Sequence, residues 1–349
     1  MLSGLKTDVV TLFDIDFRES RLGAGRLRAL ERLGGRADAA LIDLLGTSFD
    51  WIFYCDTERS KVLPGMQRID VSRLVEGDDA KGACLLVNAE FGVGVLAVWR
   101  AYDEKHRPRE IKTDLGPGQA GSEWSTLNKL AKHVEIETCE RSYPFVAVTG
   151  APSDLDRFCE ENAVELGELF TGNLEFERPD LLARYIRDGN ISSRDYERLF
   201  LRWTDCLAIY SHRERDVDRQ LTMFRAVQVY ETCILVRRLV LTVCRRMERR
   251  PFLPSPQSGQ QLDAARRIRR QFLVAIPVQS EEAGRLLSLA YDRCGMPALW
   301  AALDDAAKTL DARFQWSKAW LLGMVGVGVY VAEKLKVFDW LASYMPWTK

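Results

Sequence analysis

The strongest hydrophobic pattern of the chain lies near its C-terminus, in residues 314–347. Residues 319–332 carry no charge, and aromatic side chains stand at both ends of this run. Trp316 and Trp320 lie at its start, and Trp340 follows it. Indole rings of this kind settle at membrane–water interfaces, where one edge is apolar and the other is wet. The pattern therefore predicts a transmembrane or membrane-interfacial helix.

The length of this run leaves two interpretations open. As a helix, the uncharged run spans about 21 Å, whereas a full crossing needs about 20 apolar residues for a core of about 30 Å. Counted from Phe314, with Lys318 extending its amine towards the headgroups, the reach becomes adequate. The alternative is a buried core helix, because apolar runs of this length are common in cores.

Small residues inside the run predict helix–helix contacts. Gly323, Gly326 and Gly328 disfavour a helix in water, but small residues let helices approach closely in lipid. Two pairs have the spacing of four that places small residues on one helix face: Ala319 with Gly323 and Gly328 with Ala332. The sequence therefore predicts a homo-oligomer. Whether such helices form a simple anchor or line a pore stays open at this point.

The first part of the chain, residues 1–175, mixes strand and helix signals. Strand-like runs occur at residues 9–17, 51–55, 83–87, 93–99, 134–138 and 145–149. The runs 83–87 and 93–99 are separated by a short turn, which predicts a hairpin. Helical patterns interleave irregularly with these strands. We therefore predict a cytoplasmic α+β domain rather than a regular doubly wound one.

Residues 176–312 form the predicted helical region. Neither Gly nor Pro occurs between residues 190 and 250, which favours helix. The recurrence of Leu199, Trp203, Leu207 and Tyr210 is consistent with one buried helical stripe, followed by a long helix over residues 213–250. A proline-rich break at 251–256 follows, and helices resume before the third region, residues 313–349.

Composition, charge and cysteine content indicate where in the cell the protein is located. Of 349 residues, 47% are hydrophobic and 28% are charged, as in foldable globular proteins. The formal net charge of −1 gives no basic field that would favour nucleic acid. Eight scattered cysteines without a C-x-x-C pair fit reduced thiols, and the N-terminus has no secretory pattern. We expect the bulk of the chain in the cytoplasm, held at the inner membrane by its tail.

An arginine cluster is the main candidate for binding anions. Ten arginines fall between residues 237 and 270, opposed locally only by Glu248 and Asp263. They could contact anionic lipid headgroups or a small anionic ligand. The alternative is a solvated or salt-bridged helix face. The candidates for these contacts are Arg237, Arg238, Arg245, Arg246, Arg266, Arg267, Arg269 and Arg270.

Evidence for catalysis is weak in this sequence. Asp14 and Asp16 fall on one face of a predicted strand and could hold a metal or act in acid–base chemistry, but strand-end aspartates also serve in turns. The three histidines have no metal-type spacing, so we predict no metal site, and no nucleophile signature occurs. The sequence identifies no cofactor, and a non-enzymatic role is favoured.

In layout the chain resembles the CorA-type transporters, in which a mixed domain feeds long helices into the bilayer. The family's Gly-Met-Asn signature is missing, because Gly323-Met324 is followed by Val325, and a second membrane helix is absent from the pattern. Magnesium transport is therefore not implied. The first hypothesis is a membrane-anchored oligomer with a sensing or ligand-binding domain, as a ligand-gated pore or membrane effector. The alternative is a soluble enzyme or scaffold whose last helix belongs to a core or interface.

Overall fold

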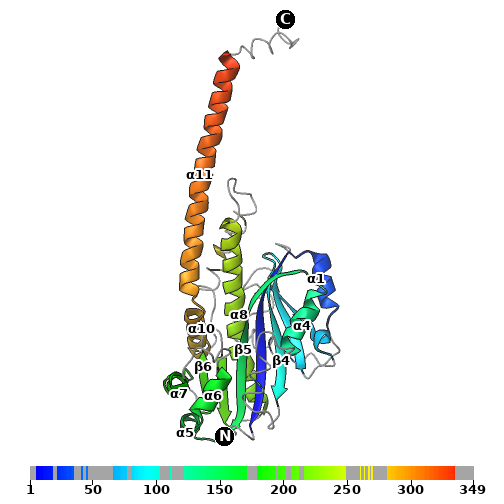
Figure 1. The fold of residues 1–349 in the computed structure, drawn as a ribbon, viewed down its shortest axis with the longest axis vertical. Coiled ribbons are helices and arrows are strands. Elements are labelled where there is room, and N and C mark those ends of the chain that lie inside the picture. Colours follow the sequence, from blue (N-terminus) through cyan, green and yellow to red (C-terminus); the bar gives the residue numbers. More distant parts are fainter. Residues whose placement is uncertain are drawn as a thin grey trace.

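The computed structural model shows a sheet covered by helices, from which one long helix projects (Figure 1). It describes residues 5–18, 22–34, 41, 45, 66–76, 80–102, 111, 122–170, 179–192, 195–201, 206–211, 216–248, 260, 263, 266–267, 269 and 281–334. Helices and strands both contribute to the body, so the fold is α+β, as the sequence predicted.

Seven strands form one mixed sheet, in the order β2-β3-β4-β1-β5-β7-β6. All neighbours are antiparallel except β5 and β7, which run parallel. The central strand β1 is buried along most of its length and lies between β4 and β5. The strands are β1 (Lys6–Phe17), β2 (Met66–Asp70), β3 (Ala80–Asn88), β4 (Val93–Tyr102), β5 (Ile136–Ala151), β6 (Glu197–Leu201) and β7 (Cys206–Ser211).

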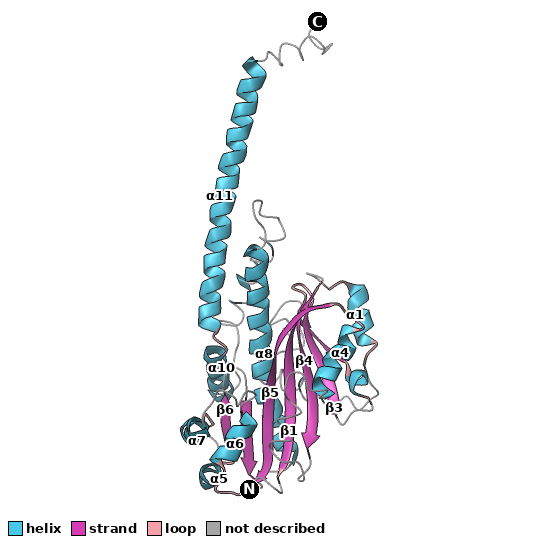
Figure 2. Cartoon of the chain, in the orientation of Figure 1, coloured by secondary structure: helices cyan, strands magenta, loops and turns pink. Residues whose placement is uncertain are grey.

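Helices cover both faces of this sheet, which divides the core into layers (Figure 2). On one face, α1 (Ala24–Glu31), the short 3-10 helix η1 (Ser72–Val75) and α4 (Ser122–Ala131) pack near β3 and β4. On the same face, α5 (Leu155–Glu161), α6 (Ala163–Phe170) and α7 (Pro179–Asp188) pack near β5, β6 and β7. Alternation along the strands directs every second side chain to each layer.

The opposite face is covered by α8 (Asp216–Glu248), and we call it the α8 face. Val10 and Leu12 of β1 share a core cluster with Phe224, Tyr230 and other buried residues of α8. The C-terminal end of β7 and the N-terminal end of β1 lie at the same edge of the sheet. Helix α8 follows β7, so it starts near that edge and runs along β1 towards Asp14 and Asp16 (Figure 1).

The last two helices extend this layer. Helix α10 (Glu281–Arg293) packs on α8, and Gly295, with a φ of 67°, makes the turn into α11 (Met296–Lys334). A left-handed residue at a helix end is the usual place for glycine. The first turns of α11 pack on α8, after which α11 extends alone beyond the other described elements (Figure 1).

Several sequence predictions agree with this fold. Strand β1 and the β3–β4 hairpin are confirmed, and so is the long helix predicted over 213–250, which is α8. The two strands predicted at 134–138 and 145–149 are one long strand, β5, with a bulge opposite Asp14. The predicted strand at 51–55 lies outside the described residues.

The helical prediction for residues 199–210 is wrong, because residues 199–201 belong to β6 and residues 206–210 to β7, while Trp203 lies outside the described residues. Absence of Gly and Pro is compatible with strands as well as helices, and the aromatic and β-branched residues of these runs favour strands. The sheet therefore continues beyond residue 175, and α8 packs on it in the same core. The proline-rich break at 251–256 lies outside the described residues.

Candidate functional site

The most unusual surface of the molecule is the distal half of α11. Met296, Trp300, Leu303 and Ala307 in its first turns are buried against the body. Every described side chain from residue 315 to residue 331 is exposed. The large hydrophobic ones are between 45% and 73% exposed, and they are Trp316, Trp320, Leu321, Leu322, Met324, Val325, Val327, Val329, Tyr330 and Val331.

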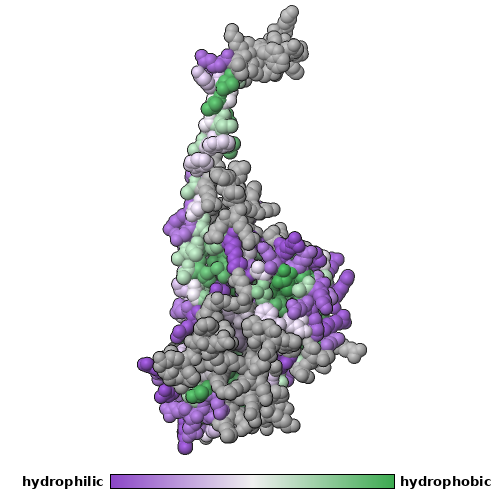
Figure 3. All heavy atoms as spheres, viewed as in Figure 1, coloured by the Kyte–Doolittle hydropathy of each residue, from purple (hydrophilic) through white to green (hydrophobic). Residues whose placement is uncertain are grey.

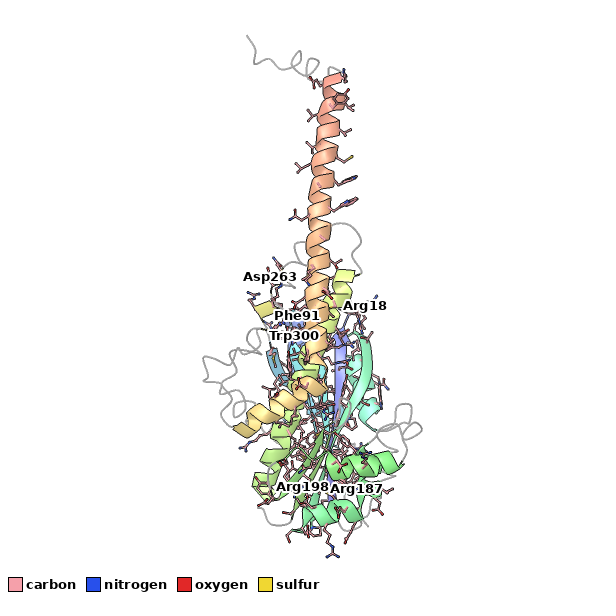
Figure 4. All side chains as sticks on the ribbon, turned by 90° about the vertical axis from the view of Figure 1, so that its left-hand side faces the viewer. Arg18, Phe91, Arg187, Arg198, Asp263 and Trp300 are labelled. Atoms are coloured by element: carbon pink, nitrogen blue, oxygen red, sulfur yellow. The ribbon has the colours of Figure 1, made fainter. Side chains whose placement is uncertain are left out.

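These apolar side chains surround the helix axis on every side. Figure 3 shows hydrophobic residues along this part of α11, and in Figure 4 its side chains radiate outward with no other described element beside them. Burying a large apolar side chain contributes about 1.5–3 kcal/mol, so water contact at ten half-exposed positions costs on the order of 10 kcal/mol. A helix that is apolar all round belongs in a core or in a membrane.

The helix is nevertheless short for a bilayer. No helix in the part of the chain that the structure describes is long and apolar enough to cross a membrane. The uncharged run ends at Glu333 and Lys334, and residues 335–349, including the predicted interface residue Trp340, lie outside the described residues. The predicted residues Trp316, Trp320, Gly323, Gly326 and Gly328 all fall in the exposed half of α11.

The three glycines of this run make no close contact with the described residues. A Cβ atom placed on Gly323, Gly326 or Gly328 would meet nothing within 4 Å. Glycine inside a helix costs about 0.5–1 kcal/mol relative to alanine. The packing of the described residues therefore gives no reason for glycine at these positions.

The predicted arginine cluster is divided by the fold. Arg238 is fully buried on the α8 face, and Arg237 donates to the Tyr143 hydroxyl at 3.3 Å. Arg246 donates to the carbonyl oxygen of Phe91 at 2.9 Å, at the turn between β3 and β4. Arg245 is partly exposed, with a guanidinium nitrogen 3.6 Å from a carboxylate oxygen of Asp16.

The later arginines lie nearer the surface. Arg267 is exposed, and Arg266 is 3.9 Å from the carboxylate of Asp263. These residues line, with Glu90 and Gln260, a cavity of about 530 Å³. Arg269 instead binds both carboxylate oxygens of Asp304 at 3.0 and 2.8 Å and lies over the Trp300 ring. Arg270 lies outside the described residues.

The aspartate pair of β1 and Arg238 form one buried network, which sequence reasoning had placed in two separate candidate sites. Arg238 donates from Nε and Nη2 to the Asp16 carboxylate at 2.9 and 2.7 Å, and its Nη1 lies 3.4 Å from Asp14. Thr242 donates to Asp16 at 2.7 Å, and Thr138 bonds both Asp16 and Arg238. Both carboxylates thus face a guanidinium rather than an open cavity.

A second buried ion pair, missed in the sequence, joins α8 to the edge strand β2. Arg68 donates to Glu231 at 2.7 and 3.2 Å and also bonds the side chain of Gln228. Burial raises the pKa of Glu231, although the neighbouring Arg68 acts in the opposite direction. An acidic residue within the apolar run of α8 was the available signal, because buried charges are kept only when paired.

Among the described residues, no group of three or more His, Cys, Asp or Glu side chains could hold a metal ion. His133 is exposed, while His106 and His212 lie outside the described residues. The two buried ion pairs described above attach α8 to strands β1 and β2 of the sheet.

Comparisons with family models, with curated proteins and with solved structures gave no match to this chain.

Two buried thiols provide a test of the packing around the sheet. Burial raises the pKa of Cys84 and of Cys159 to about 12. Because the thiolate is the reactive form, about one thiol in ten thousand is ionised at pH 8. We expect iodoacetamide to label Cys84 and Cys159 much more slowly than the half-buried Cys139 and Cys244, as followed by peptide mass spectrometry. Equal labelling rates in the folded protein would contradict this packing.

Proposed function

We propose that this protein is a membrane-anchored oligomer whose α+β domain lies in the cytoplasm and binds a ligand or a partner. One observation carries the proposal: the distal half of α11 is apolar on every side and has no covering element among the described residues. A protein partner in a groove would cover one face of such a helix, whereas lipid covers all of them. The anchor is proposed to embed in the inner membrane, and a crossing is not required.

The ends of the apolar run support lipid as the covering medium. Trp316 and Trp320 lie where α11 would enter the membrane, and Lys334 closes the described run beside Tyr330. Indole and phenol rings favour the interface, and lysine can extend its amine to the headgroups. Between Ala307, the last buried residue among the described side chains of α11, and Ala319 the helix advances about 18 Å, which sets the distance between the packed turns of α11 and the uncharged run.

The orientation of α8 supports a contact between arginines and anionic headgroups. Helices α8 and α11 run in the same direction, so the basic end of α8 faces the side towards which α11 projects (Figure 1). Arg245, Arg246, Arg266 and Arg267 remain the candidates for this contact. Arg238 is enclosed by Asp14 and Asp16, and Arg269 is bound to Asp304, so we assign both to ion pairs within the chain.

Fractionation of the full chain and of a variant ending at Arg313 tests the anchor. Every buried residue of α11 in the described structure lies at or before Ala307, so the shorter chain keeps the core of the body. We expect the full chain to resist carbonate extraction and to need detergent, and the shorter chain to be soluble with the melting temperature of the body unchanged. If the full chain stays in the soluble fraction, the anchor is wrong.

A pore would be a more specific effector activity, and it requires more than the anchor does: several copies of α11 would have to cross the bilayer around one axis. Conductance across liposomes that contain the full chain is the measurement. Ion flux that depends on the full chain, with none from the variant ending at Arg313, would support a pore. A membrane-bound chain without flux would leave the anchor in place and exclude the pore under those conditions.

A further inference from the structure

The cavity of about 530 Å³ lies between two parts of the chain that are far apart in the sequence. Its described lining comes from the turn between β3 and β4 and from a helical segment that precedes α10, and consists of Glu90, Gln260, Asp263, Arg266 and Arg267. This volume is typical of pockets for small ligands. Figure 4 places Asp263 and Phe91, the neighbour of Glu90, at the end of the body towards which α11 projects.

The wall formed by the turn is fixed by hydrogen bonds. The Phe91 amide donates to the side-chain oxygen of Asn88 at 3.3 Å, and Arg246 of α8 donates to the Phe91 carbonyl oxygen at 2.9 Å. Asn88 and Phe91 are fully buried, and Glu90 stands half-buried between them in the sequence. The backbone that carries the Glu90 carboxylate is therefore ordered in advance, which lowers the entropic cost of binding.

The opposite wall is one face of the helical segment. Positions 260, 263, 266 and 267 follow one another at spacings of three and four, which places them on the same side of a helix. The same segment is bonded to α11, because Arg269 donates to both carboxylate oxygens of Asp304. The cavity thus separates the sheet from the part of the chain that is bonded to the first turns of α11.

The charges in this cavity do not satisfy one another. A guanidinium nitrogen of Arg266 lies 3.9 Å from the Asp263 carboxylate, whereas a charge-assisted hydrogen bond is about 2.7–2.9 Å long. Neither Glu90 nor Arg267 forms an ion pair with another residue that the structure describes. Two guanidinium groups and two carboxylates therefore keep donors and acceptors for a ligand that carries both charges.

A phosphate joined to a primary amine matches these four groups. The oxygens of a phosphate accept from two guanidinium groups at once, whereas a single guanidinium already occupies both oxygens of a carboxylate. A primary ammonium group has three N–H donors for carboxylate oxygens, and a quaternary ammonium group has none.

We propose that this cavity binds an amino phosphate, with Arg266 and Arg267 on the phosphate and Glu90 and Asp263 on the ammonium group. This inference rests on the ligand-binding role proposed for the body, and it assigns that role a place and a class of ligand. Gln260 adds an amide that can donate to the phosphate.

Two sources carry this chemistry: a soluble amino phosphate and the ethanolamine headgroup of a lipid. Asp304, which marks the level of the helical segment, precedes Trp316 by twelve residues, or about 18 Å along α11. A headgroup therefore reaches the cavity only when the body approaches the bilayer, whereas a soluble ligand reaches it in any orientation.

Calorimetric titration of the full chain in an uncharged maltoside detergent tests the site with glycerophosphoethanolamine. Glycerophosphocholine keeps the phosphodiester but replaces the N–H donors by methyl groups, and glycerophosphoglycerol has no amine. We expect saturable binding of glycerophosphoethanolamine, about tenfold tighter than that of either comparison compound. Absence of saturable binding, or equal affinity for all three compounds, would overturn the proposal.

Substitutions locate the binding. Arg267→Gln changes an exposed side chain and is expected to weaken glycerophosphoethanolamine binding about tenfold, while Glu90→Gln removes most of the preference over glycerophosphocholine. Arg18→Gln is the matched control, because Arg18 is exposed and does not line the cavity, and it is expected to bind as wild type does. Unchanged binding by both cavity variants would place the ligand elsewhere and refute the assignment.

Flotation with vesicles identifies the source and separates the site from the anchor. If the ligand is a headgroup, adding phosphatidylethanolamine to phosphatidylcholine vesicles raises the bound fraction, and Glu90→Gln removes the increase. If the ligand is soluble, flotation is the same on both vesicles. A chain that binds glycerophosphoethanolamine but does not float refutes the anchor and retains the cavity. A chain that floats without binding this compound refutes the cavity and retains the anchor.

Discussion

Replacement of Arg238 by leucine is expected to destabilise the body by about 3–5 kcal/mol, the usual cost of breaking a buried ion pair by removing one partner. The guanidinium is fully buried and bonded to Asp16 at 2.7 and 2.9 Å. Without it, Asp14 and Asp16 keep their place in β1 but lose their buried cation. For a domain of this size the change corresponds to a fall in melting temperature of roughly 10 °C, measurable by circular dichroism.

Two comparisons make this prediction specific to the ion pair. Arg267→Leu removes the same charge from an exposed position and is expected to change stability by less than about 0.5 kcal/mol. A triple variant, Asp14→Leu, Asp16→Leu and Arg238→Leu, removes the whole charged group and is expected to recover most of the loss. If Arg238→Leu were as stable as Arg267→Leu, the network would not hold α8 on the sheet.

The network of Asp14, Asp16 and Arg238 shows which features of this site could be predicted from the sequence and which could not. Alternation along β1 correctly placed Asp14 and Asp16 on one strand face, and the apolar run of α8 identified a long helix. The link between them joins residues more than two hundred positions apart, and it depends on α8 running back along β1. Charge clustering alone grouped Arg238 with surface arginines, because burial is set by the tertiary fold.

Strands β6 and β7 show the complementary limit. Their residues lie in a stretch without Gly or Pro, and hydrophobic positions such as Leu199, Leu207 and Tyr210 can be read with either period. The pairing of β7 with β5 is parallel and follows three helices, so no local turn signal marks it. By contrast, the hairpin of β3 and β4 was found because its turn is local.

The apolar end of α11 is the feature that the sequence identified best, because the absence of charge is a local property. Its exposure was not predictable in the same way, since a buried core helix has the same composition. The structure adds the contrast within one helix: Trp300 and Leu303 are 1% exposed, whereas Trp316 and Leu322 are 63% and 73% exposed. Because of this contrast, we assign the first half of α11 to the core of the body and propose lipid as the environment of the second half.

Introducing two aspartates into the exposed half of α11 is expected to release the protein from membranes. At the centre of a membrane helix an aspartate costs roughly 2.5–3.5 kcal/mol, so Val325→Asp with Val329→Asp weakens insertion by several orders of magnitude. Both positions are exposed, at 61% and 51%, so the packing of the body is not altered. The expected result is a folded chain that no longer floats with liposomes.

The matched control is Val325→Ala with Val329→Ala, which keeps both positions apolar and is expected to float as wild type does. Thermal unfolding of the body should be the same in both variants, since no buried residue changes. If the double aspartate variant floats to the same extent as the alanine variant, lipid does not surround this part of α11. A helix standing in water or bound to a protein through another face would tolerate both changes, because neither removes a contact made within the described chain.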